Sequence, residues 1–222
     1  MCNRYVSPAE ADIERFWHIG RANQPRWWHE QPVEIFPRAQ GPFIRRAVDD
    51  SGYSRESASG RWGLVAGEWS LKYATNNARS EELASKASFK GPWAKGQRCI
   101  IPAVSFDEPN WESGRNQWWR FPRADGGLWG LAGLWNRWAD PKTGEIVDSY
   151  TMLTINADAH PLMRRMHKPD PKLLADQQDK RSVISIERED VDQWLAGTIA
   201  EASELLRLAP VETFDAGPLT AA

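Results

Sequence analysis

The chain has 222 residues, 41% of them hydrophobic and 26% charged, a composition that excludes an intrinsically disordered protein. The formal net charge is only −2, so the chain as a whole is not strongly basic, and any nucleic-acid contact must come from a local patch. Two cysteines, Cys2 and Cys99, are too few for a disulfide framework or a zinc site, and we expect neither a metal nor another cofactor.

The first predicted element is a helix that begins only a few residues after Cys2. Ser7, Pro8 and Glu10 have the pattern of a capping box with proline at the first helical position. Apolar residues then recur at helical spacing until Gly20 ends the element. This helix would hold the N-terminus close to ordered structure.

The middle of the chain is dominated by predicted strands. Residues 33–36 and 61–65 have strand-like patterns, and the polar stretch 48–60 between them is typical of a mobile surface loop. A short helix is expected after Ser80. Four strands then follow, at 97–106, 117–121, 128–138 and 149–155. Turn-forming residues at 140–144 predict that the last two strands form a hairpin.

The C-terminal part combines a predicted short helix at 161–166, a strand at 182–186, and helices near 191–195 and 200–208. Residues 209–222 are expected to form a loose tail. The pattern therefore predicts one compact α+β domain over residues 1–208, mostly strands with peripheral helices. No apolar run is long enough to cross a bilayer and the N-terminus lacks a secretory signal, so we expect a cytoplasmic protein. We also expect a monomer.

Five segments occur in an order that resembles the SOS response-associated peptidase (SRAP) family. They are Met1-Cys2-Asn3-Arg4-Tyr5, Arg61-Trp62-Gly63-Leu64, Asn77-Ala78-Arg79-Ser80-Glu81, the run from Arg98 to Glu108, and Leu131-Ala132-Gly133-Leu134-Trp135. The resemblance covers most of the chain, up to Trp194-Leu195. It implies a β-rich fold with a barrel-like core, and a role in the DNA-damage (SOS) response as an abasic-site processing protein.

Cys2 is the residue on which the expected chemistry depends. Once Met1 is removed, whether by an aminopeptidase or by the self-cleavage that the resemblance implies, Cys2 carries a free α-amine and a thiol on one residue. The amine has a usual pKa of about 7.7–8.0 and the thiol about 8.5, so both nucleophiles would be available near neutral pH. The amine can condense with an aldehyde to an imine, and the thiol can then close a thiazolidine ring. The ring-opened sugar of an abasic site supplies such an aldehyde.

The resemblance implies three further catalytic residues. Glu108 would move protons during ring opening and imine formation. Asn77 would hold the sugar or the forming imine through its amide. The histidine of the family's motif aligns best with His167, followed by an insertion at 169–180, and His160 is the alternative.

Single-stranded DNA is the expected partner. Arg4, Arg79 and Arg181 are candidate phosphate ligands, since a guanidinium can pair with phosphate through two hydrogen bonds. Trp62 is the candidate for stacking on a base, one of thirteen tryptophans in the chain. For each of these residues, an ordinary role in the core or on the surface is the alternative.

Three functions remain open from the sequence. The first is a protein that crosslinks itself to abasic sites through Cys2, with a lyase-like outcome if the imine eliminates before the thiol closes. The second is an N-terminal-nucleophile cysteine peptidase that cleaves peptide substrates. The third is a non-covalent module that binds single-stranded DNA or glycans through exposed tryptophans.

Overall fold

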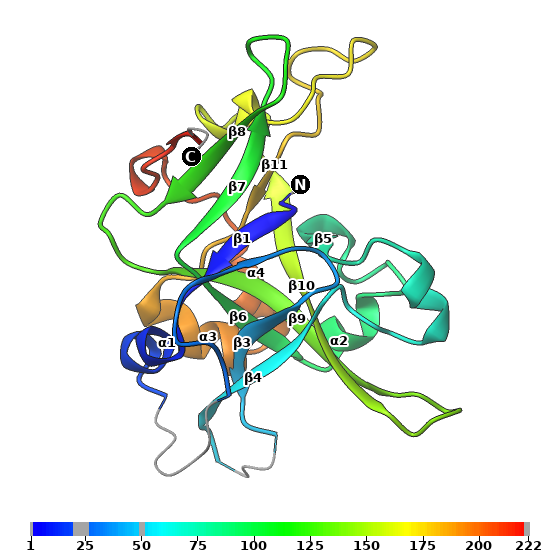
Figure 1. Ribbon diagram of the computed structural model, residues 1–222. Coiled ribbons are helices and arrows are strands. Elements are labelled where there is room, and N and C mark those ends of the chain that lie inside the picture. The colour runs from blue at the N-terminus through cyan, green and yellow to red at the C-terminus, as the bar shows by residue number, and fades with distance from the viewer. Residues whose placement is uncertain (1, 20–26, 49–51, 220–222) are drawn as a thin grey trace.

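The computed structural model describes residues 2–19, 27–48 and 52–219, and its core is a closed barrel of five strands (Figure 1). The barrel order is β10-β4-β3-β6-β9, and it closes because β9 and β10 also pair antiparallel. Its strands are β3 (Gln40–Arg46), β4 (Arg55–Trp62), β6 (Arg98–Ala103), β9 (Trp129–Ala139) and β10 (Ile146–Asn156). The predicted α+β class with a barrel-like core is confirmed, as is the hairpin of the last two long strands.

A second sheet lies beside the barrel and contains the start of the chain. Its order is β12-β8-β7-β1-β2, with bounds β1 (Arg4–Ser7), β2 (Val33–Ile35), β7 (Ser105–Asn110), β8 (Gln117–Pro122) and β12 (Gly217–Pro218). Only Val104 separates β6 of the barrel from β7 of this sheet. Two short strands, β5 (Asn77–Arg79) and β11 (Arg181–Val183), pair with the far half of β10. The N-terminus, β5, β7 and β11 therefore meet at one end of the barrel (Figure 1).

Short helices cover the outside of the sheets (Figure 1). The α-helices are α1 (Glu10–Trp17), α2 (Lys90–Ala94), α3 (Val191–Ala196) and α4 (Ile199–Glu204). Single 3-10 turns occur at η1 (Glu68–Lys72), η2 (Ser80–Glu82), η3 (Met163–Arg165), η4 (Arg188–Asp190) and η5 (Val211–Thr213). None of the described helices is long and apolar enough to cross a membrane.

A pair of tyrosines joins β1 to the barrel. The hydroxyl oxygens of Tyr5 on β1 and Tyr150 on β10 lie 2.6 Å apart, and both rings are buried. They meet directly over Gly41, where a Cβ would clash with both hydroxyl groups. The absence of a side chain at Gly41 thus lets the two sheets approach, and this fixes the strand that follows Cys2.

Two expectations about the first half of the chain were wrong. Residues 55–60 do not belong to a loop but form most of β4, whose buried positions include Ser57 and Gly60. Phe43 and the backbone of Asp148 fill the space at Gly60, so this strand does not need a large apolar side chain there. Its sequence therefore lacks the alternation of apolar and polar residues by which a strand is predicted. The capping box is also absent, since the Glu10 carboxylate accepts hydrogen bonds from the backbone of Trp27 and Trp28 instead.

Residues 209–219 are packed against the sheets, although the sequence predicts a loose tail from residue 209 onward. Phe214 is buried against Phe121 and Trp129, at ring-centroid distances of 6.2 and 5.2 Å. Residues 217–218 add β12 to the edge of β8. An isolated aromatic residue in a polar segment has no periodicity, so the sequence pattern could not reveal this contact.

Candidate functional site

Cys2 lies at the end of the barrel where β1, β5 and β7 meet. Its side chain is fully buried, and its thiol donates to the carbonyl oxygen of Arg4 at 3.3 Å. Burial, and after it the negative charge of Glu108, raises the pKa of the Cys2 thiol well above its usual value. The expected supply of thiolate near neutral pH is therefore absent in this conformation, and the thiol needs a base to react.

Asn77 holds the backbone of Cys2. Its amide nitrogen donates to the Cys2 carbonyl oxygen at 2.7 Å, across 75 positions of sequence. The residue begins β5, which pairs parallel to β10 with Asn77 opposite Met152. Among the described residues its Oδ1 atom is buried without a hydrogen-bond partner, which leaves an acceptor available beside Cys2.

Glu108 and His167 form the acid–base pair of the site. Nε2 of His167 lies 2.8 Å from Oε2 of Glu108, whose side chain is only 1% exposed. Burial alone would raise the pKa of Glu108, but positive charge at the amino end of the chain and on His167 outweighs it and lowers that pKa. Glu108 is thus ionised at neutral pH and can accept a proton.

The backbone of His167 is held in an unusual conformation. Its φ is +62°, in the left-handed region, and its N–H donates to the Pro109 carbonyl at 2.6 Å. The ammonium of Lys180 donates to the carbonyl oxygens of Met166 and His167, at 2.7 and 2.6 Å. A strained conformation persists where several contacts enforce it, and here they aim the imidazole at Glu108.

The other candidate histidine has a structural role. His160 is buried, with Nε2 3.0 Å from the Ala209 carbonyl oxygen and Nδ1 accepting from the backbone of Leu162 and Met163. Both ring nitrogens are therefore occupied by backbone groups. Of the two candidates, the structure brings His167 and not His160 to Glu108.

The arginines predicted to bind phosphate differ in their surroundings. Arg4 lies 2.5 Å from the buried carboxylate of Asp107, with its guanidinium 5.3 Å from the centroid of the Trp118 ring. Arg79 is about two-fifths exposed and pairs with Asp179 at 2.5 Å. Both guanidinium groups remain at the surface near the site.

Two of the predicted DNA ligands are instead part of the protein interior. Arg181 is 3% exposed and is held by Glu81, Asp179 and the carbonyl of Thr154, so it is not free to bind a phosphate. Trp62 has no exposed surface and donates through Nε1 to the Asn76 carbonyl at 2.8 Å. A fully buried ring cannot stack on a base, so these two predictions are wrong. Trp62 thus bonds the residue before β5, and Arg181 pairs with Glu81, two residues after it.

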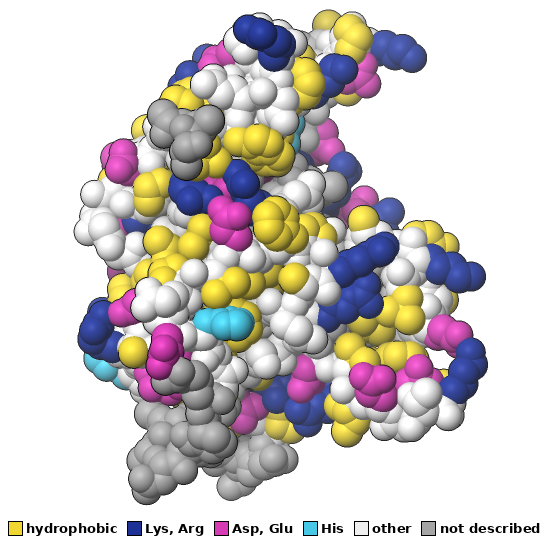
Figure 2. Space-filling model, viewed as in Figure 1, with side chains coloured by type: hydrophobic (Ala, Val, Ile, Leu, Met, Phe, Trp, Pro, Cys, Tyr) yellow, Lys and Arg dark blue, Asp and Glu magenta, His cyan; other side chains and the backbone are white. Residues whose placement is uncertain are grey.

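Exposed aromatic and basic residues near β5 were missed by the sequence analysis. Trp69 and Tyr73 are exposed and contact each other edge to face, with ring centroids 6.2 Å apart. Arg38 and Arg61 are the basic residues. Burial lowers the pKa of Arg61, and the charge of Arg38 lowers it further. Among the described residues neither arginine has a carboxylate at ion-pair distance. Figure 2 shows Lys and Arg side chains gathered in patches over this face, with apolar side chains between them. The spacing of residues in the sequence could not distinguish these exposed aromatic residues from aromatic residues of the core.

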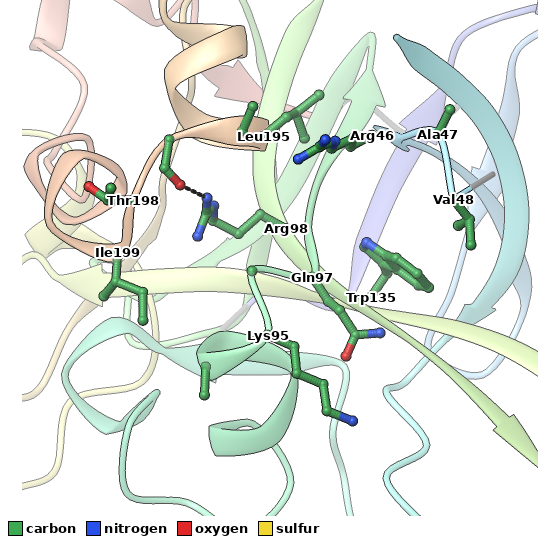
Figure 3. Close-up of a pocket in the computed structure, with 14 residues that line it drawn as sticks. Arg46, Ala47, Val48, Lys95, Gln97, Arg98, Trp135, Leu195, Thr198 and Ile199 are labelled. Atoms are coloured by element: carbon green, nitrogen blue, oxygen red, sulfur yellow. Dashed lines mark hydrogen bonds between the residues drawn. The ribbon is translucent and has the colours of Figure 1, made fainter. Parts of the chain in front are cut away.

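A separate pocket of about 520 Å³ lies between α2, α3 and the start of β6 (Figure 3). Its most buried cation, Arg98, donates to the carbonyl oxygens of Trp194 and Gly197 and so satisfies the end of α3. None of the predicted site residues lines this pocket. Across the described residues, no group of three or more His, Cys, Asp or Glu side chains is arranged to hold a metal ion.

Comparison with known proteins identifies relatives of the whole chain. The family described as SOS response associated peptidase (SRAP) matches residues 1–222. The Abasic site processing protein YoqW of Bacillus subtilis is 33% identical over 186 residues, which cover 81% of this chain and 79% of that protein. The Abasic site processing protein HMCES of Gallus gallus is 30% identical over 175 residues, or 62% of this chain. The chain spans about half the length of the vertebrate relatives, 51% for the chicken protein.

Solved structures show the same fold. A crystal structure of a protein from Bordetella bronchiseptica has a TM-score of 0.83 and 34% identity, covering 99% of this chain and 100% of that one. A second, from Bacteroides thetaiotaomicron, has a TM-score of 0.74 at 21% identity over 99% of this chain and 92% of that one. The second likeness concerns the fold alone.

Proposed function

The chain belongs to the SOS response associated peptidase (SRAP) family, and we propose that it processes abasic sites by bonding covalently to them through Cys2. The observation that carries this proposal is the arrangement around Cys2. Asn77 holds its carbonyl oxygen, and Glu108, paired with His167, is close enough for its charge to act on the thiol. The names of the relatives from Bacillus subtilis and Gallus gallus support the same substrate.

The reaction begins once Met1 has been removed, a step that we assign to self-cleavage in keeping with the family. The α-amine of Cys2 attacks the aldehyde carbon of the ring-opened deoxyribose, and loss of one water leaves an imine. The amine acts first, because burial and the charge of Glu108 raise the pKa of the thiol. The S–H bond then adds across the C=N bond, with sulfur on carbon and the proton on nitrogen, which closes a thiazolidine ring.

The neighbouring side chains supply the proton transfers. Glu108 accepts the proton of the attacking amine and returns it to the departing hydroxyl as water forms. His167 donates a hydrogen bond to the same carboxylate and so keeps it oriented. The unpaired Oδ1 of Asn77 accepts a hydrogen bond from the sugar or from the Cys2 amine. Placed carboxylates of this kind contribute about 10²–10⁴-fold to a rate.

Single-stranded DNA fits the surroundings of the site. Trp69 and Tyr73 offer exposed rings, on which bases of any sequence can stack. Arg38 and Arg61 offer two adjacent cations, and a phosphate between them would relieve their repulsion, which together with the larger effect of burial lowers the pKa of Arg61. We assign this activity to a monomeric cytoplasmic protein of the DNA-damage response.

An adduct experiment tests the proposal. The protein without Met1 is incubated with a single-stranded oligonucleotide that carries one abasic site, and the intact mass is measured under denaturing conditions without reductant. We expect the mass of protein plus oligonucleotide less one water, absent in Cys2→Ala and in an oligonucleotide without the abasic site. No adduct with fully processed protein would overturn the proposal. An adduct seen only after borohydride reduction would show an imine without ring closure. Turnover of peptides in place of an adduct would favour the peptidase.

A further inference from the structure

A groove of about 770 Å³ opens beside the catalytic pair, and His167 is part of its wall. The other lining residues include Trp111 and Arg164, and Pro169, Leu173 and Gln178 of the segment 168–180. Nothing in the reaction at Cys2 uses this space. In Figure 1 the gold segment 168–180 rises beside the green connection between β7 and β8, and together the two segments enclose the groove.

The segment 168–180 is held in place by its own side chains. The amide of Gln178 accepts from the backbone N–H of Asp170 and donates to the carbonyl oxygens of Asp170, Leu173 and Leu174. The carboxylate of Asp158 accepts from the backbone N–H groups of Asp179 and Lys180. These hydrogen bonds give the segment a defined conformation, although nearly all of its side chains lie on the surface.

The same segment is connected to the catalytic histidine. Lys180, at its end, donates to the carbonyl oxygen of His167 at 2.6 Å, and His167 donates to Glu108. On the opposite wall, Arg165 is bound by both carboxylate oxygens of Glu112, at 2.9 and 2.8 Å. A ligand in the groove would thus contact Lys180, which is hydrogen-bonded to the backbone of His167 in the acid–base pair.

The chemistry of the walls matches a nucleotide. The indole of Trp111 provides a π surface, and Pro169 and Leu173 provide apolar contacts in the same groove. The Lys168 ammonium lies 5.3 Å from the Trp111 centroid. Among the described residues the side chain of Arg164 makes no hydrogen bond or ion pair, so its charge is available to a phosphate. The polar groups of Gln178 are already occupied and cannot read the edge of a base.

We propose that this groove holds the base of a nucleotide next to the abasic site, and thereby positions the reacting sugar at Cys2. The inference rests on the proposed function, because an abasic site has no base of its own by which it could be held. It predicts a requirement for a neighbouring base with little preference for its identity, since stacking does not depend on the edge of the base and the charge of Arg164 suits a phosphate. Purines should be favoured modestly over pyrimidines for their larger surface.

The test uses oligonucleotides in which one neighbour of the abasic site, first on the 5′ side and then on the 3′ side, is replaced by a stable tetrahydrofuran spacer. The spacer lacks both a base and an aldehyde. With the processed wild-type protein we expect one of the two replacements to slow adduct formation about tenfold, the size of one lost base stack. Trp111→Ala should react slowly with the unmodified neighbour and no longer respond to the spacer, whereas Trp111→Phe should restore much of the response.

A matched pair of leucines provides the control. Leu173 lines the groove, and Leu174 lies next to it in the same segment but does not line it. Leu173→Ala should weaken the response to the spacer, and Leu174→Ala should leave it unchanged. Thermal unfolding of each variant reports whether the fold is intact. Equal wild-type rates with both spacers, or a full response in Trp111→Ala, would overturn the inference.

A binding measurement separates this inference from the covalent mechanism. Fluorescence anisotropy is recorded with oligonucleotides in which the central abasic site is itself a tetrahydrofuran, so that no bond to Cys2 can form. If adducts fail to form but binding still weakens when the neighbouring base is missing, the groove is supported and the covalent mechanism is not. If adducts form and neither rate nor binding depends on the neighbour, the groove has no such role.

Discussion

The Nε2 atom of His167 and the Oε2 atom of Glu108 lie 2.8 Å apart although 59 positions separate them in the sequence. The carboxylate is almost completely buried, and its pKa is lowered in spite of that burial. A carboxylate that stays ionised in spite of burial can accept a proton in the site, and Glu108 is close enough to Cys2 for its charge to raise the pKa of the thiol. Four predictions follow from this region and from the fold that supports it.

Glu108→Gln should slow adduct formation about 10²–10⁴-fold, because the side chain keeps its size but can no longer accept a proton. It should also lower the pKa of the Cys2 thiol. The charge of Glu108 raises that pKa and its removal reverses this part of the shift, while the larger effect of burial remains. Adduct mass against time measures the rate, and thiolate absorbance against pH measures the pKa. The exposed Glu204→Gln is the control. An unaltered rate would exclude Glu108 as the base.

Asn77→Ala should reduce the rate of adduct formation about 100-fold, since small displacements of a reacting group have effects of this size. The variant loses the hydrogen bond that holds the Cys2 carbonyl oxygen. Asn77→Asp retains the shape but not the N–H donor and should be similarly slow. Asn156→Ala, at the exposed end of β10, should react as wild type. The idea fails if Asn77→Asp forms adducts at the wild-type rate.

Acid should weaken the fold through the pair of Glu81 and Arg181. The hydrogen bonds from Arg181 lower the pKa of Glu81 from its usual value of 4.5 to about 2. A carboxylate whose pKa is lower in the folded state stabilises the protein above its unfolded pKa, and this contribution is lost as the pH falls from about 4.5 to about 2. Urea unfolding at several pH values should show a shallower loss of stability over this range in Glu81→Gln. Glu82→Gln is the matched control, and identical pH profiles for the two variants would contradict the assignment.

Phe214→Ala should lower the free energy of unfolding by about 3–5 kcal/mol, the usual effect of removing a buried phenylalanine ring. The ring packs against Phe121 and Trp129, so its loss leaves a cavity under β8. Val211→Ala changes an exposed side chain in the same segment and should have little effect. Urea denaturation of the wild type and the two variants measures the free energies of unfolding. Equal stability of Phe214→Ala and wild type would mean that the segment contributes nothing to the fold.

The local pattern of residues was sufficient for the elements whose signals are local. Apolar spacing predicts α1, and turn residues at 140–144 predict the β9–β10 hairpin, because both depend on neighbours in the chain. It was insufficient for β4, where Ser57 and Gly60 are buried and Phe43 of another strand fills the space at Gly60. The same limit explains the C-terminal segment, whose one buried ring is anchored by residues far away in sequence.

For the site, the sequence by itself determined which chemical groups are present: a cysteine at position 2 with an amine and a thiol, an amide at Asn77 and a carboxylate at Glu108. Only the tertiary structure decided which of them act together. It paired Glu108 with His167 and not with His160, it buried Trp62 and Arg181, and it exposed Trp69 and Tyr73. The physical reason is that burial and charge pairing depend on contacts between distant parts of the chain, 59 positions apart for Glu108 and His167 and 100 for Glu81 and Arg181. Cys2 obtains its carbonyl contact from a residue 75 positions away, which no local pattern encodes.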